Sequence, residues 1–141
     1  MTSDEQEVEA AVRRYYETND KLLSGQGGSN MEELWLHDDR VTMALPTGDL
    51  LEGWDQVQVV WQTAATIGAK GRGGLTVVSV KVRVCGSMAY AASIIAAPPI
   101  FGGETLTATT VLEKHDGRWK VVHQHTDRSP KMLAALEKFT P

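Results

Sequence analysis

The stretch that decides the fold is the last predicted strand with the turn before it, and it reads His115-Asp116-Gly117-Arg118-Trp119-Lys120-Val121-Val122-His123-Gln124-His125-Thr126-Asp127. Asp-Gly is a strong hairpin signal, because glycine tolerates the positive φ that tight primed turns need. The segments on either side should therefore pair as antiparallel strands, with residues 106–114 as the partner of the last strand. Side chains alternate between the faces of a strand, so one face carries Trp119, Val121, His123, His125 and Asp127, and the other carries Lys120, Val122, Gln124, Thr126 and Arg128.

Length and composition indicate one ordinary globular domain over residues 1–141, because 42% of the residues are hydrophobic and 23% are charged. The net charge of −4, with no basic stripe, argues against a nucleic-acid-binding surface. The N-terminus is acidic and polar, unlike a signal peptide, and no apolar run has membrane-spanning length. We therefore expect a cytoplasmic protein that binds neither nucleic acid nor a membrane.

Periodicity and turn residues predict the remaining elements. Ser3 and Gln6 form a capping box for the first helix, and Ser29 or Asn30 caps a short second one. The helices are expected over 3–23, over 31–36, from Gly53 onward, and from Pro130 onward with Met132, Leu133, Leu136 and Phe139 on the apolar side. The strands before the last one are expected over 41–45, 75–85, 88–97 and 106–114. Helices followed by a run of antiparallel strands place the chain in the α+β class.

Three segments resemble one known superfamily. Residues 116–125 resemble the closing strand of the calcium/calmodulin-dependent kinase association domain, and residues 48–55 resemble the segment before its third helix. Residues 14–17 are similar to the ketosteroid isomerase segment that carries the oxyanion-binding tyrosine. The chain thus resembles the nuclear transport factor 2-like or SnoaL-like superfamily, which also includes polyketide cyclases. This resemblance implies a cystatin-like cone, in which a curved antiparallel sheet wraps around helices, but it does not assign the chemistry.

The resemblance also implies a deep pocket inside the cone and a homodimer through the outer face of the sheet. It puts Gln124 on the pocket side of the last strand, and His123 and His125 on the outer face at the dimer interface. The other residues that it implies for the pocket wall are Trp35, Leu45, Trp61, Tyr90, Ala92, Ile94, Ala108, Thr110, Leu112, Val122 and Thr126.

Tyr15 is the candidate hydrogen-bond donor of this pocket. Its counterpart in the isomerases donates to a developing enolate oxygen, and a preorganised phenol could do so here. A core tyrosine bonded to a neighbour explains the same position equally well. A small error in helix phase would exchange Tyr15 with Tyr16.

The acids and arginines of the relatives are missing. The isomerase aspartates fall on Ala44-Leu45-Pro46 and on Thr110, and a hydroxyl is a poor general base without an activating partner. Steroid-type isomerisation is therefore not expected. The association-domain arginines fall on Ala92, Thr110 and Thr126, so a carboxylate ligand would lack its partners. The remaining apolar and aromatic wall suits a neutral, flat organic molecule.

Two further readings concern the histidines. His123 and His125 lie about 7 Å apart on one face, but two imidazoles without a third ligand do not make a metal site, and none is expected. If the faces of the strand were reversed, His125 with Asp127 would form a base and its orienting group.

Our leading interpretation is a protein that binds a neutral, largely apolar metabolite. If it is an enzyme, it promotes a cofactor-free isomerisation, cyclisation or dehydration, as in polyketide biosynthesis. Tyr15 would polarise a carbonyl, Gln124 and Thr110 would orient the ligand, and Trp35 and Trp61 would pack on it. The alternative is a non-catalytic binding or assembly domain that forms a homodimer, which the lack of a pocket carboxylate favours.

Overall fold

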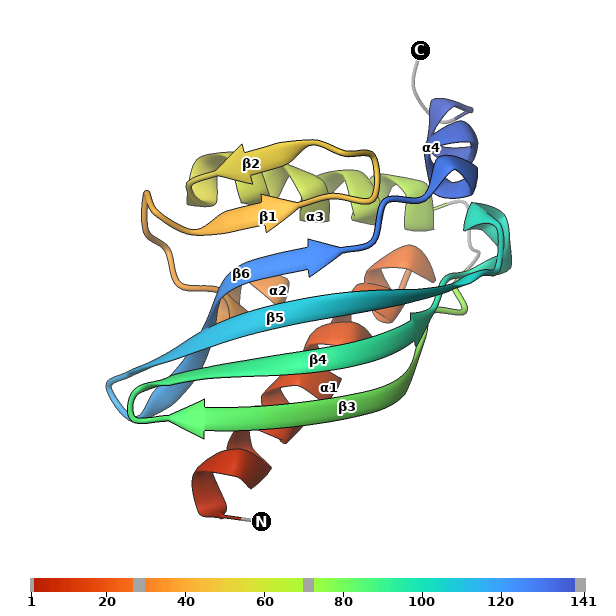
Figure 1. Ribbon diagram of the computed structural model, residues 1–141. Coiled ribbons are helices and arrows are strands. Elements are labelled where there is room, and N and C mark those ends of the chain that lie inside the picture. The colour runs from red at the N-terminus through yellow and green to blue at the C-terminus, as the bar shows by residue number, and fades with distance from the viewer. Residues whose placement is uncertain (1, 27–29, 70–72, 139–141) are drawn as a thin grey trace.

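A computed structural model describes residues 2–26, 30–69 and 73–138, so that Ser29 and Phe139 lie outside the described residues (Figure 1). The elements in chain order are α1 (Ser3–Leu23), α2 (Met31–Leu34), β1 (Thr42–Ala44), β2 (Leu50–Glu52), α3 (Trp54–Gly68), β3 (Thr76–Cys85), β4 (Met88–Ala96), the 3₁₀ turn η1 (Pro99–Phe101), β5 (Thr105–His115), β6 (Arg118–Thr126) and α4 (Pro130–Glu137). None of the described helices is both long and apolar enough to cross a membrane.

The strands form one curved sheet in the order β2-β1-β6-β5-β4-β3. Figure 1 shows α1 crossing one face of the sheet, where it packs against β3 and β4, while α3 lies beside α1 and the short strands β1 and β2. This arrangement confirms the predicted α+β class with a curved sheet around helices. The predicted run of four antiparallel strands is confirmed by β3, β4, β5 and β6, while the short β1 runs parallel to β6.

The hairpin between β5 and β6 confirms the prediction from Asp-Gly. Asp116 and Gly117 both have positive φ, 51° and 78°, and His115 pairs with Arg118 across the turn. Two positive φ values define the primed turn whose twist matches that of the flanking strands. The hairpin therefore follows from the two turn residues.

A β-bulge corrects the predicted faces of β6. Val111 pairs with His123 and Leu112 with Val121, so Val122 is an extra residue without a partner on β5. An extra residue reverses the alternation beyond it. Val121 and Trp119 therefore share the inner face with Gln124 and are 1% and 8% exposed, although strict alternation predicted them on the outer face.

The predicted faces of β4 were also reversed. Ala91 pairs with Thr110, and these two inner residues are fully buried. Tyr90 and Ile94 lie on the outer face and are 45% and 40% exposed, and Ala92 is exposed beside them. The inner face of β4, on which α1 packs, carries the buried side chains of Ala89, Ala91, Ser93 and Ile95.

The helix starts show how side chains select the boundaries. Thr2, not Ser3, caps α1, because the Thr2 hydroxyl oxygen accepts a hydrogen bond from the backbone N–H of Glu5 at 3.1 Å. Asn30 occupies the N-cap position of α2, which is shorter than expected. It ends at Leu34 because Trp35 is extended and bridges to Val121 of the sheet.

Candidate functional site

A cavity of about 540 Å³ lies between α1, α3 and the inner face of the sheet. Of the residues predicted for the site, Tyr15, Leu45, Trp61, Gln124 and Thr126 line it. The remaining wall is largely aliphatic and comes from α3, β1, η1 and α4. The structure thus provides the hollow that the resemblance implied, and its size is typical of a small-molecule site.

An aromatic cluster forms one side of the cavity. The ring of Tyr15 meets those of Tyr16 and Trp61 edge to face, with centroids 5.2 Å and 5.6 Å apart. The ring centroid of Trp35 lies 6.3 Å from that of Tyr15. Trp35 is nevertheless buried in the core and does not line the cavity. Trp61 therefore can pack directly on a ligand, whereas Trp35 supports Tyr15 and Trp61 from the side.

A buried polar network holds the Gln124 side chain in one orientation. Thr110 Oγ1 donates a hydrogen bond to Gln124 Oε1 at 2.5 Å, and Gln124 Nε2 donates to the hydroxyl oxygen of Tyr16 at 3.1 Å. Gln124 Nε2 also lies 3.5 Å from Thr126 Oγ1. Thr110 itself does not line the cavity. Its effect is to fix the amide, so that the Gln124 nitrogen faces Tyr16.

The two adjacent tyrosines both line the cavity and differ in their partners. The Tyr16 hydroxyl accepts from Gln124, and burial raises the pKa of Tyr16 although this hydrogen bond opposes the increase. The Tyr15 hydroxyl is buried and has no hydrogen-bond partner within the part of the chain that the structure describes. Burial, with the nearby Tyr16, raises the pKa of Tyr15 well above its ordinary value, so both phenols stay protonated near neutral pH.

Trp61 carries a second donor without a partner, its indole Nε1–H. An unpaired buried donor costs about 1–3 kcal/mol relative to one that is hydrogen-bonded. Tyr15 and Trp61 both line the cavity and each carries such a buried donor, which favours a ligand with a hydrogen-bond acceptor. The sequence suggested the Tyr15 donor through resemblance, but it gave no sign that Trp61 would share this property.

The cavity lining holds no carboxylate, imidazole, amine or guanidinium among the described residues. Asp127 does not orient His125, because its carboxylate accepts hydrogen bonds from the N–H and hydroxyl of Thr107, which lower its pKa. His125 is exposed on the outer face. His125 and Asp127, the base and orienting group that reversed strand faces would have brought inward, therefore lie outside the cavity.

His123 also lies outside the cavity, with its Nδ1 2.7 Å from the hydroxyl oxygen of Thr42. Burial, together with the neighbouring His125, lowers the pKa of His123. No three His, Cys, Asp or Glu side chains within the described ranges lie close enough to hold a metal ion.

Several predicted wall residues are not part of the cavity, for two reasons. The reversed faces place Tyr90, Ala92, Ile94 and the bulge residue Val122 away from it. Core packing hides Trp35 behind the aromatic cluster. Tyr16, which the sequence left open as an alternative to Tyr15, also lines the cavity, and the wall residues that sequence reasoning missed include Met43, Val60, Ile67, Phe101, Met132 and Leu136. Met132 and Leu136 have a signal in the sequence, the apolar side of α4, but its destination depends on tertiary structure.

The sequence model of the SnoaL-like domain matches residues 8–127 of this chain. The F-box protein SKIP8 of Arabidopsis thaliana is 32% identical over 96 residues, which are 68% of this chain and 40% of SKIP8. The chain thus spans well under half the length of that curated relative.

Two solved structures support the fold. A cystatin-like protein from Caulobacter vibrioides aligns with a TM-score of 0.69 at 16% identity, over 94% of this chain and 93% of that one. A candidate dehydratase from Streptomyces avermitilis aligns with a TM-score of 0.66 at 22% identity, over 91% of this chain and 97% of that one. At these identities the two structures are evidence of shared fold alone.

Proposed function

The chain belongs to the family of SnoaL-like domains, and from this premise we propose that its cavity binds one neutral, largely apolar organic molecule with a carbonyl or similar acceptor. The observation that carries this proposal is the combination of an uncharged lining with the unpaired donors of Tyr15 and Trp61. A charged ligand would lose its hydration and find no opposite charge in the described lining, which is unfavourable. A ketone or lactone loses little hydration free energy on entering the cavity, and its oxygen can accept a hydrogen bond from Tyr15 or Trp61.

Apolar contact would supply most of the affinity, and the donors would set the orientation. A flat bicyclic ligand that buries about 200 Å² of apolar surface gains roughly 5 kcal/mol, before the entropy of association is subtracted. One hydrogen bond adds about 1 kcal/mol. Ligand selection should therefore follow shape and polarity first, and the position of the acceptor second.

The lining supports binding more directly than catalysis. Tyr15 could polarise a carbonyl while Gln124, positioned by Thr110, orients the ligand. No described side chain of the wall can take up a proton near neutral pH. An isomerisation, cyclisation or dehydration in this cavity would therefore transfer its proton to water or to a group of the substrate itself.

The proposal is tested by titrating the protein with 2-acetylnaphthalene, a neutral aromatic ketone, and following tryptophan fluorescence. The matched probes are 2-naphthoate, which is charged, and 2-ethylnaphthalene, which has no acceptor. We expect the ketone to bind at least tenfold more tightly than the carboxylate. Equal affinity for the ketone and the carboxylate would contradict the proposal.

We further propose a homodimer through the outer face of the sheet, the second function that a specific observation favours. Val78, Met88, Tyr90 and Ile94 are large apolar side chains exposed on β3 and β4, a density that is unusual for a free surface. In this homodimer His123 and His125, which lie on the outer face of β6, would be at the dimer interface.

Sedimentation equilibrium tests the homodimer. We expect a dimer for the unaltered chain and a monomer for the double variant Tyr90→Lys and Ile94→Lys. Burying the two new lysine charges of β4 in the interface would cost more free energy than the remaining contacts supply. Val59→Lys, an equally exposed site on α3, is the matched control and should stay dimeric. A monomer for the unaltered chain would refute the assembly.

A further inference from the structure

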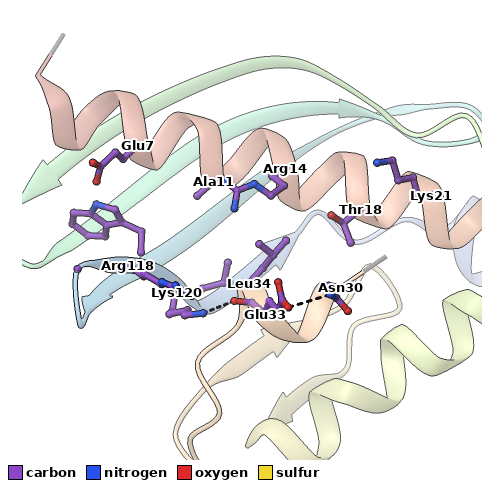
Figure 2. Close-up of a pocket in the computed structure, with 13 residues that line it drawn as sticks. Glu7, Ala11, Arg14, Thr18, Lys21, Asn30, Glu33, Leu34, Arg118 and Lys120 are labelled. Carbon is purple, nitrogen blue, oxygen red and sulfur yellow. Dashed lines mark hydrogen bonds between the residues drawn. The ribbon is translucent and has the colours of Figure 1, made fainter. Parts of the chain in front are cut away.

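A second hollow of about 480 Å³ lies between α1, α2 and the start of β6, and it shares no described lining residue with the cavity. Figure 2 shows its long wall on α1, where Glu7, Ala11, Arg14, Thr18 and Lys21 follow one another. The opposite wall is made of Asn30, Glu33 and Leu34 from α2 and Arg118 and Lys120 from β6. We call this hollow the α1–α2 groove.

The α1–α2 groove gathers positive charge on a chain whose net charge is −4. The side chains of Arg14, Lys21 and Arg118 make no hydrogen bond or ion pair with any described residue. Lys120 donates to the backbone oxygen of Glu33, whose carboxylate accepts from Asn30 at 3.1 Å. Three cationic side chains are thus available for an external anionic partner.

The groove also has an apolar lining, made of Ala11 and Leu34 from the two walls and Trp119 and Val121 from β6, which we call its floor. Trp119 is only 8% exposed. The indole Nε1–H of Trp119 is buried without a hydrogen-bond partner. An unpaired buried donor on the groove floor is an observation independent of the charged rim, and it favours an occupant that brings a carbonyl oxygen.

The length of the α1 wall indicates an elongated occupant. Glu7 and Lys21 are fourteen residues apart on α1, which corresponds to about 21 Å along the helix axis. A compact anion would fill only part of this length. An extended peptide rises about 3.3 Å per residue, so roughly six residues match this length.

We propose that the α1–α2 groove binds an extended segment of a partner protein, about six residues long, in which acidic and apolar side chains alternate. Alternation directs the apolar side chains to the floor and the acidic ones to Arg14, Lys21 and Arg118. A backbone carbonyl of the segment accepts the hydrogen bond from Trp119. Glu7 and Glu33 in the walls disfavour a partner with a phosphate at every position, such as nucleic acid.

The probe is the peptide acetyl-Glu-Leu-Glu-Ala-Glu-Leu-amide, titrated into the full chain by calorimetry and by nuclear magnetic resonance. We expect the indole N–H signal of Trp119, identified with Trp119→Phe, to shift on binding. The pair Arg14→Gln and Arg118→Gln should weaken binding by about tenfold and reduce its dependence on salt.

The matched control pair is Lys81→Gln and Arg83→Gln, which removes two exposed charges from β3 without touching the groove. This pair should leave the affinity unchanged, as should occupation of the cavity by 2-acetylnaphthalene. Failure of the peptide to bind, equal weakening by both pairs, or a Trp119 signal that does not move would overturn the proposal. Tripolyphosphate that binds as tightly as the peptide and displaces it would also overturn it, because the occupant would then be a compact anion.

Discussion

Replacing Tyr15 by Phe should stabilise the free protein and weaken ligand binding. The Tyr15 hydroxyl is buried without a partner, so the folded state bears its desolvation with no compensating hydrogen bond. Removing it should raise the free energy of unfolding by about 1 kcal/mol. For a chain of this length that corresponds to an increase of roughly 3 °C in Tm.

The adjacent variant, Tyr16→Phe, is the matched control because it should change stability in the opposite direction. The Tyr16 hydroxyl accepts a hydrogen bond at 3.1 Å from Gln124, which is 1% exposed. Without the Tyr16 hydroxyl, Gln124 Nε2 keeps only the long contact to Thr126 Oγ1. The expected loss is about 1–2 kcal/mol, or roughly 3–6 °C in Tm.

Thermal and urea unfolding of the three proteins give the stability, and fluorescence titration gives the affinity for 2-acetylnaphthalene. Tyr15→Phe should weaken ketone binding by about five- to tenfold and leave 2-ethylnaphthalene unaffected. Destabilisation by Tyr15→Phe as large as that by Tyr16→Phe would refute the reasoning, since the Tyr15 hydroxyl would then already be satisfied in the free protein.

Three further predictions concern the cavity, the outer face and the hairpin. Ala64→Phe should fill part of the cavity and weaken ketone binding at least tenfold in the fluorescence titration, whereas unchanged affinity would place the probe elsewhere. The lowered pKa of His123 means that the unfolded state binds its proton more readily, so Tm should fall as pH drops below about 6.5 toward the folded-state pKa. His123→Gln should reduce the fall of Tm with pH below about 6.5. If Tm falls as steeply in His123→Gln as in the unaltered chain, other groups cause the pH dependence. Gly117→Ala should lower stability by about 1 kcal/mol in urea unfolding, because φ is 78° there while no atom lies within 4 Å of the added carbon; no loss would argue against the primed turn.

The features predicted best from the sequence are those set by neighbouring residues. The hairpin at Asp116 and Gly117 depends on two φ values that these residue types tolerate well. The start of α3 after Gly53 and the start of α4 at Pro130 are likewise local. Such signals do not depend on how the elements pack.

The errors occurred where tertiary structure decides. The bulge at Val122 has no local signal, because Val121 and Val122 are chemically identical and only pairing with β5 distinguishes them. On β4 the resemblance implied that Tyr90, Ala92 and Ile94 face inward, yet Ala91 and Ile95 are the buried residues, 0% and 5% exposed. The apolar outer face left by this reversal is also the observation that favours a dimer.

The candidate site was predicted in part for similar reasons. Resemblance led to Tyr15, Trp61 and Gln124, which line the cavity. It could not decide between Tyr15 and Tyr16, and the structure brings both to the wall because the cavity is broad enough to span two successive positions of α1. Which phenol has a partner depends on Gln124, more than a hundred residues away in the chain.

The central claim is that a neutral carbonyl ligand occupies the cavity and accepts a hydrogen bond from Tyr15. Infrared difference spectroscopy of bound 2-acetylnaphthalene with an isotope-labelled carbonyl measures that bond directly. The account predicts a carbonyl stretch at lower wavenumber than in an apolar solvent, restored toward the solvent value in Tyr15→Phe. A bound ketone whose stretch is the same in both proteins would contradict it.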